Sequence, residues 1–215
     1  MTLPALPAGH RVVPLGPDSW PLFAELVERN KGVYGGCWCI GYHPECGQVP
    51  RTAHRAVKQQ RVMGDQAHAA LVLDAEGHCQ AWAQYGRPDE LSGIKHRRAS
   101  DKEPPPAPDW RLTCIYVDPA RRGHGLARSA VIGALDLVAA AGGGVVEAIS
   151  ETTDGRVAQG RFLFTATAEL LEDLGFVRGR QVGKHAWILS RGVPALPEAH
   201  QSPGANGPVR TGAPD

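Results

Sequence analysis

The segment from residue 115 to residue 128 holds the clearest chemical signal in the sequence. It reads IYVDPARRGHGLAR, so an apolar stretch ends at Asp118 and Pro119 and is followed by two glycines and three arginines. Glycine lets a backbone approach a ligand closely. The first turn of a helix has free N–H groups and the positive end of the helix dipole. The segment therefore predicts a phosphate-binding loop between a strand and a helix.

Two common phosphate-binding loops do not fit this segment. A P-loop needs the sequence Gly-x4-Gly-Lys-Ser/Thr, and no lysine lies nearby. A dinucleotide-binding loop needs a third small residue where this chain has Arg128. The pattern that fits is Arg/Gln-x-x-Gly-x-Gly/Ala, which is filled by Arg122, Gly125 and Ala127.

With the strand and the Asp-Pro turn before it, this pattern resembles the coenzyme A loop of the GNAT acetyltransferase superfamily. The sequence LLEDLGF at 170–176 is similar to the second motif of that family, and the resemblance covers roughly residues 110–191. It implies a GNAT-like α/β fold (mixed α+β) with a mostly antiparallel central sheet and helices on both faces. It also implies that acetyl-CoA is the co-substrate.

The resemblance further implies how acetyl-CoA lies. Backbone amides of the loop would bind the pyrophosphate, and the end of the preceding strand would hydrogen-bond the pantetheine arm. The acyl carbonyl would sit where this strand parts from the strand expected at 145–149. The residues assigned to acetyl-CoA on this basis are Ile115, Tyr116, Val117, Arg122, Gly123, His124, Gly125, Leu126, Ala127 and Arg128.

The acid and the base for the reaction need other candidates than the usual ones. Many members of the family protonate the leaving thiolate with a tyrosine four residues before the glycine of the second motif, but Leu171 occupies that position here. Tyr116 lies beside the expected thioester and is a candidate donor. Glu147 interrupts an apolar strand, where a carboxylate is costly without a partner or a task, so it is the candidate base. Packing by Tyr116 and an ion pair of Glu147 remain alternatives.

The loop at 35–46 reads GGCWCIGYHPEC and is the most unusual part of the sequence. In the family, the connection after the first helix commonly lines the acceptor site, so Trp38, Tyr42 and His43 are predicted to contact the acceptor. Cys37, Cys39, His43 and Cys46 are an alternative zinc set. Their spacing is not that of a usual zinc finger, and no metal is predicted. A reactive cysteine is the least favoured interpretation.

Composition restricts the class of protein. The chain has 215 residues, of which 42% are hydrophobic and 21% charged, as in one ordinary folded domain. A net charge of +1 gives no strong field for nucleic acid or an anionic membrane. There is no long apolar span and no signal-peptide pattern. Five unevenly spaced cysteines do not suggest a disulfide framework. We therefore expect a cytoplasmic protein without nucleic-acid or membrane partners, and a homodimer is left open.

Apolar periodicity predicts the element order β α α β β β α β α β β, in one domain at 1–191. The Pro- and Gly-rich residues 192–215 are expected to be disordered. A basic run at 95–98 is expected to be solvated, with a grip on an acidic ligand as the lesser alternative. The strands are expected at 10–15, 69–73, 79–85, 111–117, 145–149, 176–181 and 185–190, and the helices at 20–29, 52–66, 123–141 and 165–174.

The sequence therefore predicts an acyltransferase of the EC 2.3.1 type. Acetyl would pass directly from acetyl-CoA to a primary amine of a small molecule or peptide, without a covalent enzyme intermediate. Two alternatives remain. Leu171 makes a catalytically weak acyl-CoA-binding regulatory module thinkable, and the loop at 37–46 could support a zinc-stabilised interaction domain. The sequence does not identify the acceptor.

Overall fold

A computed structural model describes residues 6–103, 106–153, 155 and 164–197 of the chain. Its strands are β1 (Arg11–Pro14), β2 (His68–Leu73), β3 (Cys79–Gly86), β4 (Trp110–Val117), β5 (Gly144–Glu151), β6 (Val177–Gln181) and β7 (Ala186–Val193). Its helices are α1 (Trp20–Arg29), α2 (His54–Met63), α3 (Arg97–Ser100), α4 (Leu126–Ala140) and α5 (Ala168–Asp173), with 3-10 turns η1 (Arg51–Ala53) and η2 (Pro119–Arg121).

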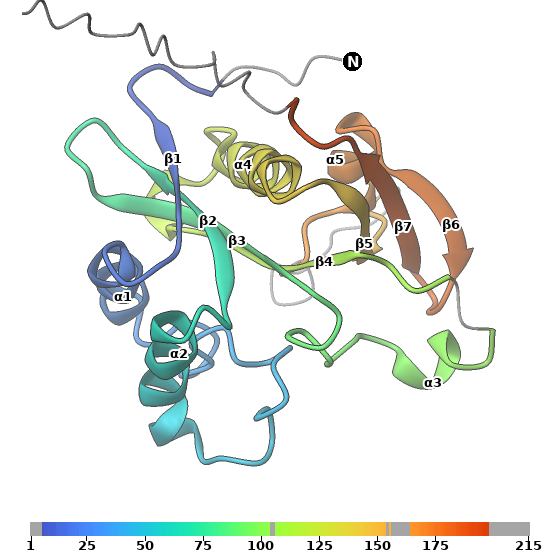
Figure 1. Ribbon diagram of the computed structural model, residues 1–215, viewed down its shortest axis with the longest axis horizontal. Helices are drawn as coiled ribbons and strands as arrows, with labels where there is room; N and C mark the ends of the chain where they lie inside the picture. Colours follow the sequence, from blue (N-terminus) through green and yellow to red (C-terminus); the bar gives the residue numbers. More distant parts are fainter. Residues whose placement is uncertain (1–5, 104–105, 154, 156–163, 198–215) are drawn as a thin grey trace, which may run out of the picture.

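The strands described form one sheet in the order β1-β2-β3-β4-β5-β7-β6 (Figure 1). Neighbouring strands are antiparallel except β4 and β5, which are parallel. The parallel step is made by α4, which crosses from one of these strands to the other as expected for a βαβ unit. The predicted mixed, mostly antiparallel sheet is confirmed.

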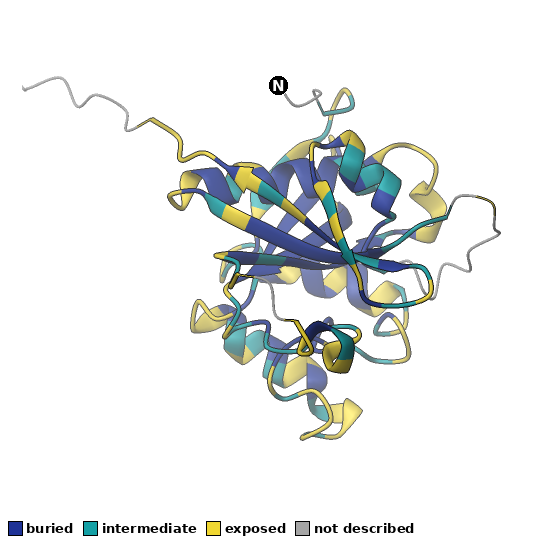
Figure 2. Ribbon diagram, turned by 90° about the vertical axis from the view of Figure 1, so that its right-hand side faces the viewer, coloured by how far each residue is buried: buried dark blue, intermediate teal, exposed yellow. Residues whose placement is uncertain are grey.

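Helices cover both faces of the sheet, and side-chain alternation along β3 shows which helix faces which side. Ala83 belongs to a buried cluster with Ala130 and Leu135 of α4. Trp82, the next residue toward the start of the strand, belongs to a second cluster with Phe23 of α1. Because successive strand residues point to opposite faces, α4 and α1 lie on opposite sides. Figure 2 shows the sheet nearly on edge between two groups of helices, with buried residues concentrated along it.

A β-bulge in β4 changes the face that its side chains occupy. Ala83 of β3 is opposite Ile115, and Tyr85 is opposite Leu112, so three steps in β4 match two in β3. The extra residue breaks the alternation. Leu112 and Ile115 therefore pack on the α4 side, whereas Cys114 packs on the α1 side.

Strands β4 and β5 part just before the bulge. Their parallel pairing is registered only at Trp110 with Val146 and at Arg111 with Glu147. Further along β4, the Ile115 N–H donates to the carbonyl of Phe164 at 2.7 Å instead of to β5. The segment that follows Phe164 also forms a parallel bridge to β5 at Thr167. The predicted separation of these strands is therefore present, and part of the opening is filled by the chain itself.

The prediction for the tail needs a correction at its start. Strand β7 continues to Val193, two residues past the expected boundary at 191, because Val193 is buried in the α4 cluster. The Leu196 N–H also donates to the Ala139 carbonyl at 3.0 Å. Residues 198–215, the rest of the predicted tail, lie outside the described residues. The short helix α3 was not predicted either, and it includes part of the basic run at 95–98.

A truncation pair tests this boundary. A chain ending at Arg191 loses the buried Val193 side chain and the end of β7, whereas a chain ending at Pro197 keeps both. Full burial of a valine stabilises by about 1.5–3 kcal/mol. We therefore expect the shorter chain to melt roughly 3–10 °C below the longer one by circular dichroism. Equal melting temperatures would show that residues after Arg191 do not stabilise the sheet.

Candidate functional site

The turn η2 between β4 and α4 is anchored by Asp118. The Asp118 carboxylate accepts a hydrogen bond from the Ala120 N–H at 3.0 Å and one from Arg29 Nε of α1 at 2.8 Å. Burial opposes ionisation of Asp118, but the Arg29 guanidinium and the Ala120 amide hold its pKa below the ordinary value. The start of the loop is therefore fixed to α1 before the glycines begin.

The glycines of the loop have a conformation that other residues rarely adopt. Gly123 and Gly125 have φ values of 81° and 78°, and no atom lies within 4 Å of a Cβ added at either position. The first bond of α4 runs from the Ser129 N–H to the Gly125 carbonyl at 3.1 Å. The amides of residues 126–128 therefore have no acceptor within the helix. The loop presents free N–H groups beside open space.

This open space is a cavity of about 750 Å³, here called the loop cavity. It is lined by every residue assigned to acetyl-CoA from the sequence except His124. The Nδ1 atom of His124 lies 2.9 Å from the Arg122 carbonyl. Its lining residues are Tyr34, Ile115, Tyr116, Val117, Arg122, Gly123, Gly125, Leu126, Ala127, Arg128 and Leu170.

A second cavity, of about 530 Å³ and here called the apolar cavity, lies next to the first. Tyr34 lines both cavities, and its ring centroid lies 5.9 Å from that of Tyr116 and 6.0 Å from that of Phe164. The two spaces therefore meet at an aromatic partition beside the end of β4. The lining residues of the apolar cavity are Tyr34, Cys37, Cys39, Gly41, Tyr42, Gly93, Ile94, Lys95, Cys114 and Phe164.

Only one of the three predicted acceptor residues lies in the wall of the apolar cavity. Tyr42 does, and its buried hydroxyl has no hydrogen-bond partner among the described residues. Trp38 instead packs against the rings of Trp20 and Phe23 of α1. His43 is 1% exposed and makes its ring contacts elsewhere in the core. The structure therefore does not place Trp38 or His43 against an acceptor in this cavity.

The alternative of a zinc site does not agree with the structure. Both ring nitrogens of His43 are engaged, Nδ1 with the Glu90 carbonyl at 3.1 Å and Nε2 with Lys58 Nζ at 3.0 Å. Cys46 is exposed, whereas Cys39 is buried. Over the part of the chain that is described, no three His, Cys, Asp or Glu side chains are arranged to hold a metal. In this structure the described side chains of the Cys37–Cys46 loop are therefore not arranged as a zinc site.

The two candidate catalytic residues lie apart. Tyr116 lines the loop cavity and stacks on Trp82 with ring centroids 4.7 Å apart. Glu147 pairs in register with Arg111, and its Oε1 lies 3.8 Å from Arg111 Nε. Arg111 is four residues from Ile115 along β4, which is roughly 13 Å in a strand. Glu147 therefore sits at the closed end of the separation, and a role as base would need connecting water.

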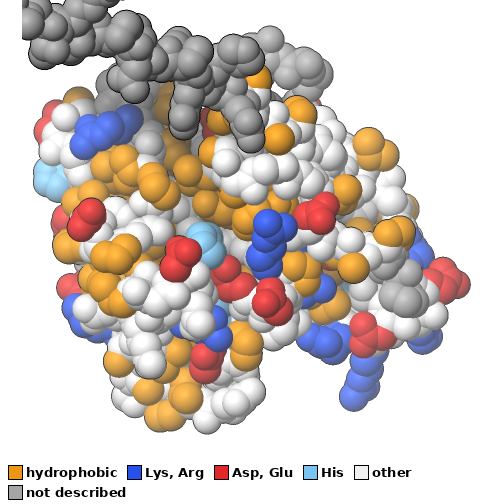
Figure 3. All heavy atoms as spheres, in the orientation of Figure 1, with side chains coloured by type: hydrophobic (Ala, Val, Ile, Leu, Met, Phe, Trp, Pro, Cys, Tyr) orange, Lys and Arg blue, Asp and Glu red, His pale blue; other side chains and the backbone are white. Residues whose placement is uncertain are grey.

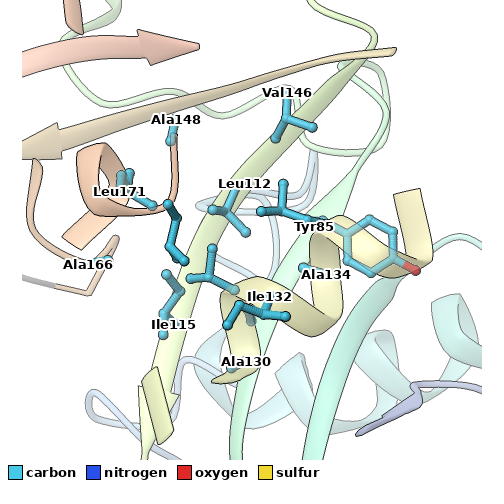
Figure 4. Close-up of a cluster of buried hydrophobic side chains, with 14 of the residues drawn as sticks. Tyr85, Leu112, Ile115, Ala130, Ile132, Ala134, Val146, Ala148, Ala166 and Leu171 are labelled. Carbon is cyan, nitrogen blue, oxygen red and sulfur yellow. The ribbon is translucent and has the colours of Figure 1, made fainter. Parts of the chain in front are cut away.

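Leu171 supplies no acid from the second motif. It is fully buried, and Figure 4 shows it directed into the cluster that also contains Ala166, Ile115 and Ala148. The site therefore has to take any acid from another element.

Several residues of the apolar cavity were not predicted from the sequence. Tyr34, Gly93, Ile94, Lys95, Cys114 and Phe164 come from separate segments and share no motif. Lys95 belongs to the run predicted to be solvated, but its side chain is only 16% exposed and lies 3.3 Å from Glu151. Cys114 faces the cavity because of the bulge in β4. A local pattern could not have identified these positions.

Two further features concern the surface charge and the length of the helices. Figure 3 shows Lys and Arg side chains interspersed with Asp and Glu on the face in view. None of the described helices is long and apolar enough to cross a membrane.

Glu147 gives a pH-dependent prediction. Burial raises its pKa above the ordinary value of 4.5, opposed by Arg111, so folding favours its protonated form. This stabilisation is complete below the ordinary pKa and is lost as the pH rises through the folded-state pKa. We expect Glu147→Gln to match the parent near pH 4 and to exceed it in stability at pH 8, measured by urea unfolding. A less stable variant at pH 8 would show that the attraction of Arg111 outweighs burial.

Comparison with known proteins places this geometry in a family. Residues 36–163 match the acetyltransferase (GNAT) family. A Corynebacterium glutamicum structure described as histone acetyltransferase HPA2 and related acetyltransferase is 19% identical, with a TM-score of 0.50 over 89% of this chain and 99% of its own. The ribosomal-protein-S5-alanine acetyltransferase of Vibrio fischeri is 15% identical, with a TM-score of 0.50 over 88% and 96%.

A mosquito arylalkylamine N-acetyltransferase-like protein is 13% identical, with a TM-score of 0.51 over 85% of this chain and all (100%) of its own. At these identities the similarity concerns the fold alone. No curated protein matches the sequence significantly. The family match, however, covers more than half of the chain and includes the loop of Gly123 and Gly125. The chain therefore belongs to the GNAT family of acetyltransferases.

Proposed function

We propose that this protein transfers the acetyl group of acetyl-CoA to the primary amine of a small molecule or peptide. The observation that carries the proposal is the pair of adjoining cavities. One is lined by a glycine-rich loop with free amides, the other is apolar, and Tyr34 lines both. An acyl donor and an acceptor could therefore enter from different sides and meet at the end of β4.

The loop cavity fits the phosphates of coenzyme A. The amides of residues 126–128 and the positive end of α4 suit a pyrophosphate, and the two glycines leave room for it. Arg122 and Arg128 line the same space. Arg128 also contacts Asp173 Oδ2 at 2.7 Å, so its charge is partly compensated, and the backbone is expected to carry most of the binding.

The edge of β4 fits the pantetheine arm only in part. The Ile115 N–H is already bonded to Phe164, which differs from the sequence-based expectation that it would bind the arm. Alternate residues of a strand direct their amides to the same edge, so Val117 presents its N–H there as well. We therefore assign the pantetheine contact to Val117 in the conformation described, with Ile115 contributing its side chain to the cavity wall.

The apolar cavity favours an acceptor with an apolar body. Its walls carry the rings of Tyr34, Tyr42 and Phe164, and the charge at its rim, Lys95, is paired with Glu151. Apolar surface buried there would stabilise binding by about 25 cal/mol per Å². A strongly polar acceptor such as a short acidic peptide would gain little from these walls.

Turnover with an amine panel tests the proposal. Release of coenzyme A thiol from acetyl-CoA should rise on addition of arylalkyl or long alkyl amines, and mass spectrometry should find the acetylated amine. Ethanolamine and lysine serve as polar comparison amines. Tight acetyl-CoA binding with no amine-dependent thiol release would instead support the alternative of a regulatory acyl-CoA-binding module, which Leu171 makes reasonable.

A glycine pair tests the loop cavity. Gly125→Glu places a side chain and a negative charge where the pyrophosphate is expected, so acetyl-CoA binding measured by calorimetry should be lost. Gly142→Glu is the matched control, because Gly142 follows the far end of the same helix, has φ of 97° and also has open space around an added Cβ. Near-normal affinity in a folded Gly125→Glu protein would contradict the assignment of the loop.

A further inference from the structure

A small recess adjoins the apolar cavity at the place where β4 and β5 part. It has a volume of about 20 Å³ and is lined by residues 111–113 of β4 and 147–149 of β5, together with Tyr42 and Thr165. We call it the polar recess. Tyr42 and Gly93 line both the recess and the apolar cavity. One water molecule needs roughly 10–15 Å³, so the recess has room for a single oxygen-sized group but not for a ring.

Polar atoms without a partner are concentrated at this recess. Over the described residues, five buried side-chain nitrogen or oxygen atoms make no hydrogen bond. Three of them, the Tyr42 hydroxyl, Arg111 Nε and the Thr165 hydroxyl, belong to residues that line the recess. Tyr42 is 9% exposed and Thr165 is 3% exposed. Burying such an atom without a partner is costly, so their concentration at one place indicates a site for a bound polar atom.

The surrounding backbone holds two of these groups in position. The Gly93 N–H donates to the Tyr42 carbonyl at 2.9 Å, and a Cβ added at Gly93 would lie only 3.0 Å from Tyr42 Cα. Arg111 Nη1 donates to the carbonyls of Pro88 at 3.2 Å and Leu91 at 2.7 Å. Because these contacts already fix the two residues, a ligand that enters the recess has little ordering cost to overcome.

The atoms and charges of the recess favour a neutral oxygen as ligand. Arg111 Nε can only donate a hydrogen bond, and the hydroxyls of Tyr42 and Thr165 can also donate, so an oxygen with two lone pairs can accept from this set. Arg111 Nε lies 3.8 Å from Glu147 Oε1, so the guanidinium charge is already opposed by a carboxylate. An anionic ligand would face that carboxylate. The recess therefore fits a hydroxyl or carbonyl oxygen better than a carboxylate or phosphate.

The position of the recess along β4 limits the shape of the ligand. Arg111 and Thr113 precede Ile115, which lines the loop cavity, by four and two residues. At the rise of a strand this is roughly 7–13 Å. An acceptor with its amine at the end of the loop cavity and its body in the apolar cavity therefore reaches the recess with the end of the body that is distant from the amine.

We propose that the polar recess is a specificity subsite, in which Tyr42, Arg111 and Thr165 bind a neutral oxygen at the end of the acceptor opposite its amine. The inference rests on the proposed acetyltransferase function and narrows its substrate class. The acceptor is then a primary amine with an apolar body and a distal hydroxyl or carbonyl group.

Three amines of one scaffold test the subsite. Tyramine and para-methylphenethylamine differ only in that a hydroxyl replaces a methyl group of similar size. The kcat/KM for acetylation should be at least about tenfold higher with tyramine, because only its oxygen satisfies the buried donors. The carboxylate analogue, para-(aminoethyl)benzoate, should be the poorest of the three. Equal kcat/KM for the first two amines would show that the recess takes only water and would overturn the proposal, as would a preference for the carboxylate.

Two threonines of the recess provide matched variants. Thr165→Val removes an unpartnered hydroxyl, whereas Thr113→Val removes one that accepts a hydrogen bond from Gln84 Nε2 at 3.3 Å. Thr165→Val and Tyr42→Phe should each reduce the tyramine preference at least about threefold without lowering the melting temperature. Thr113→Val should lower the melting temperature and keep the preference. A full preference in both Thr165→Val and Tyr42→Phe would show that these hydroxyls do not bind the acceptor.

Binding measurements separate this proposal from the proposed function. Calorimetry in the presence of coenzyme A gives the Kd of tyramine and of para-methylphenethylamine without turnover. A Kd at least about tenfold lower for tyramine, lost in Thr165→Val, would support the subsite even if neither amine is acetylated, and the missing turnover would then contradict the proposed function. Acetylation of both amines with equal Kd and equal kcat/KM would support the proposed function and overturn the subsite.

Discussion

The separation of β4 from β5 is the constraint on which the site depends. The two parallel strands are registered only at Trp110 and Arg111 of β4, and the later residues from Cys114 to Val117 line the two cavities instead of pairing with β5. The bulge in β4 follows directly after the last registered pair and adds one residue there, which turns Cys114 toward α1 and Ile115 toward α4. This irregularity therefore assigns neighbouring residues to different faces at the point where β4 leaves β5.

An opened edge exposes backbone groups that need partners, and the chain satisfies them in two ways. The Ile115 N–H bonds to Phe164, and the Ser150 hydroxyl donates to the Thr165 carbonyl at 2.8 Å. The segment at 164–167 thus connects the two strands at the inner part of the separation. Toward the end of β4 no such connection is described, and the loop cavity lies there. Strand β4 is therefore hydrogen-bonded to the chain itself at Ile115, whereas Val117, two residues later, lines the loop cavity.

The two cavities differ in how well the sequence predicts them. The loop cavity is built mainly from residues 115–128, and its glycines, arginines and helix start are contiguous, so their spacing indicates its function. The apolar cavity joins residues from four distant segments. Strict alternation along β4 would place Cys114 with Leu112, and only the bulge contradicts it. Lys58 lies in a polar helix whose sequence resembles that of a solvent-exposed helix, so its burial could not be predicted from the sequence pattern either.

The loop that contains Cys39 has a strained backbone that aromatic packing stabilises. Val33, Tyr34, Trp38 and Cys39 all have positive φ, which is costly for residues with a side chain and especially for a β-branched one. Aromatic packing offsets this cost, because Trp38 stacks on Trp20 at 6.1 Å and meets Phe23 at 6.5 Å. Trp38, predicted to contact the acceptor, packs against α1 in this structure. Its packing holds the turn that places the next residue, Cys39, in the wall of the apolar cavity.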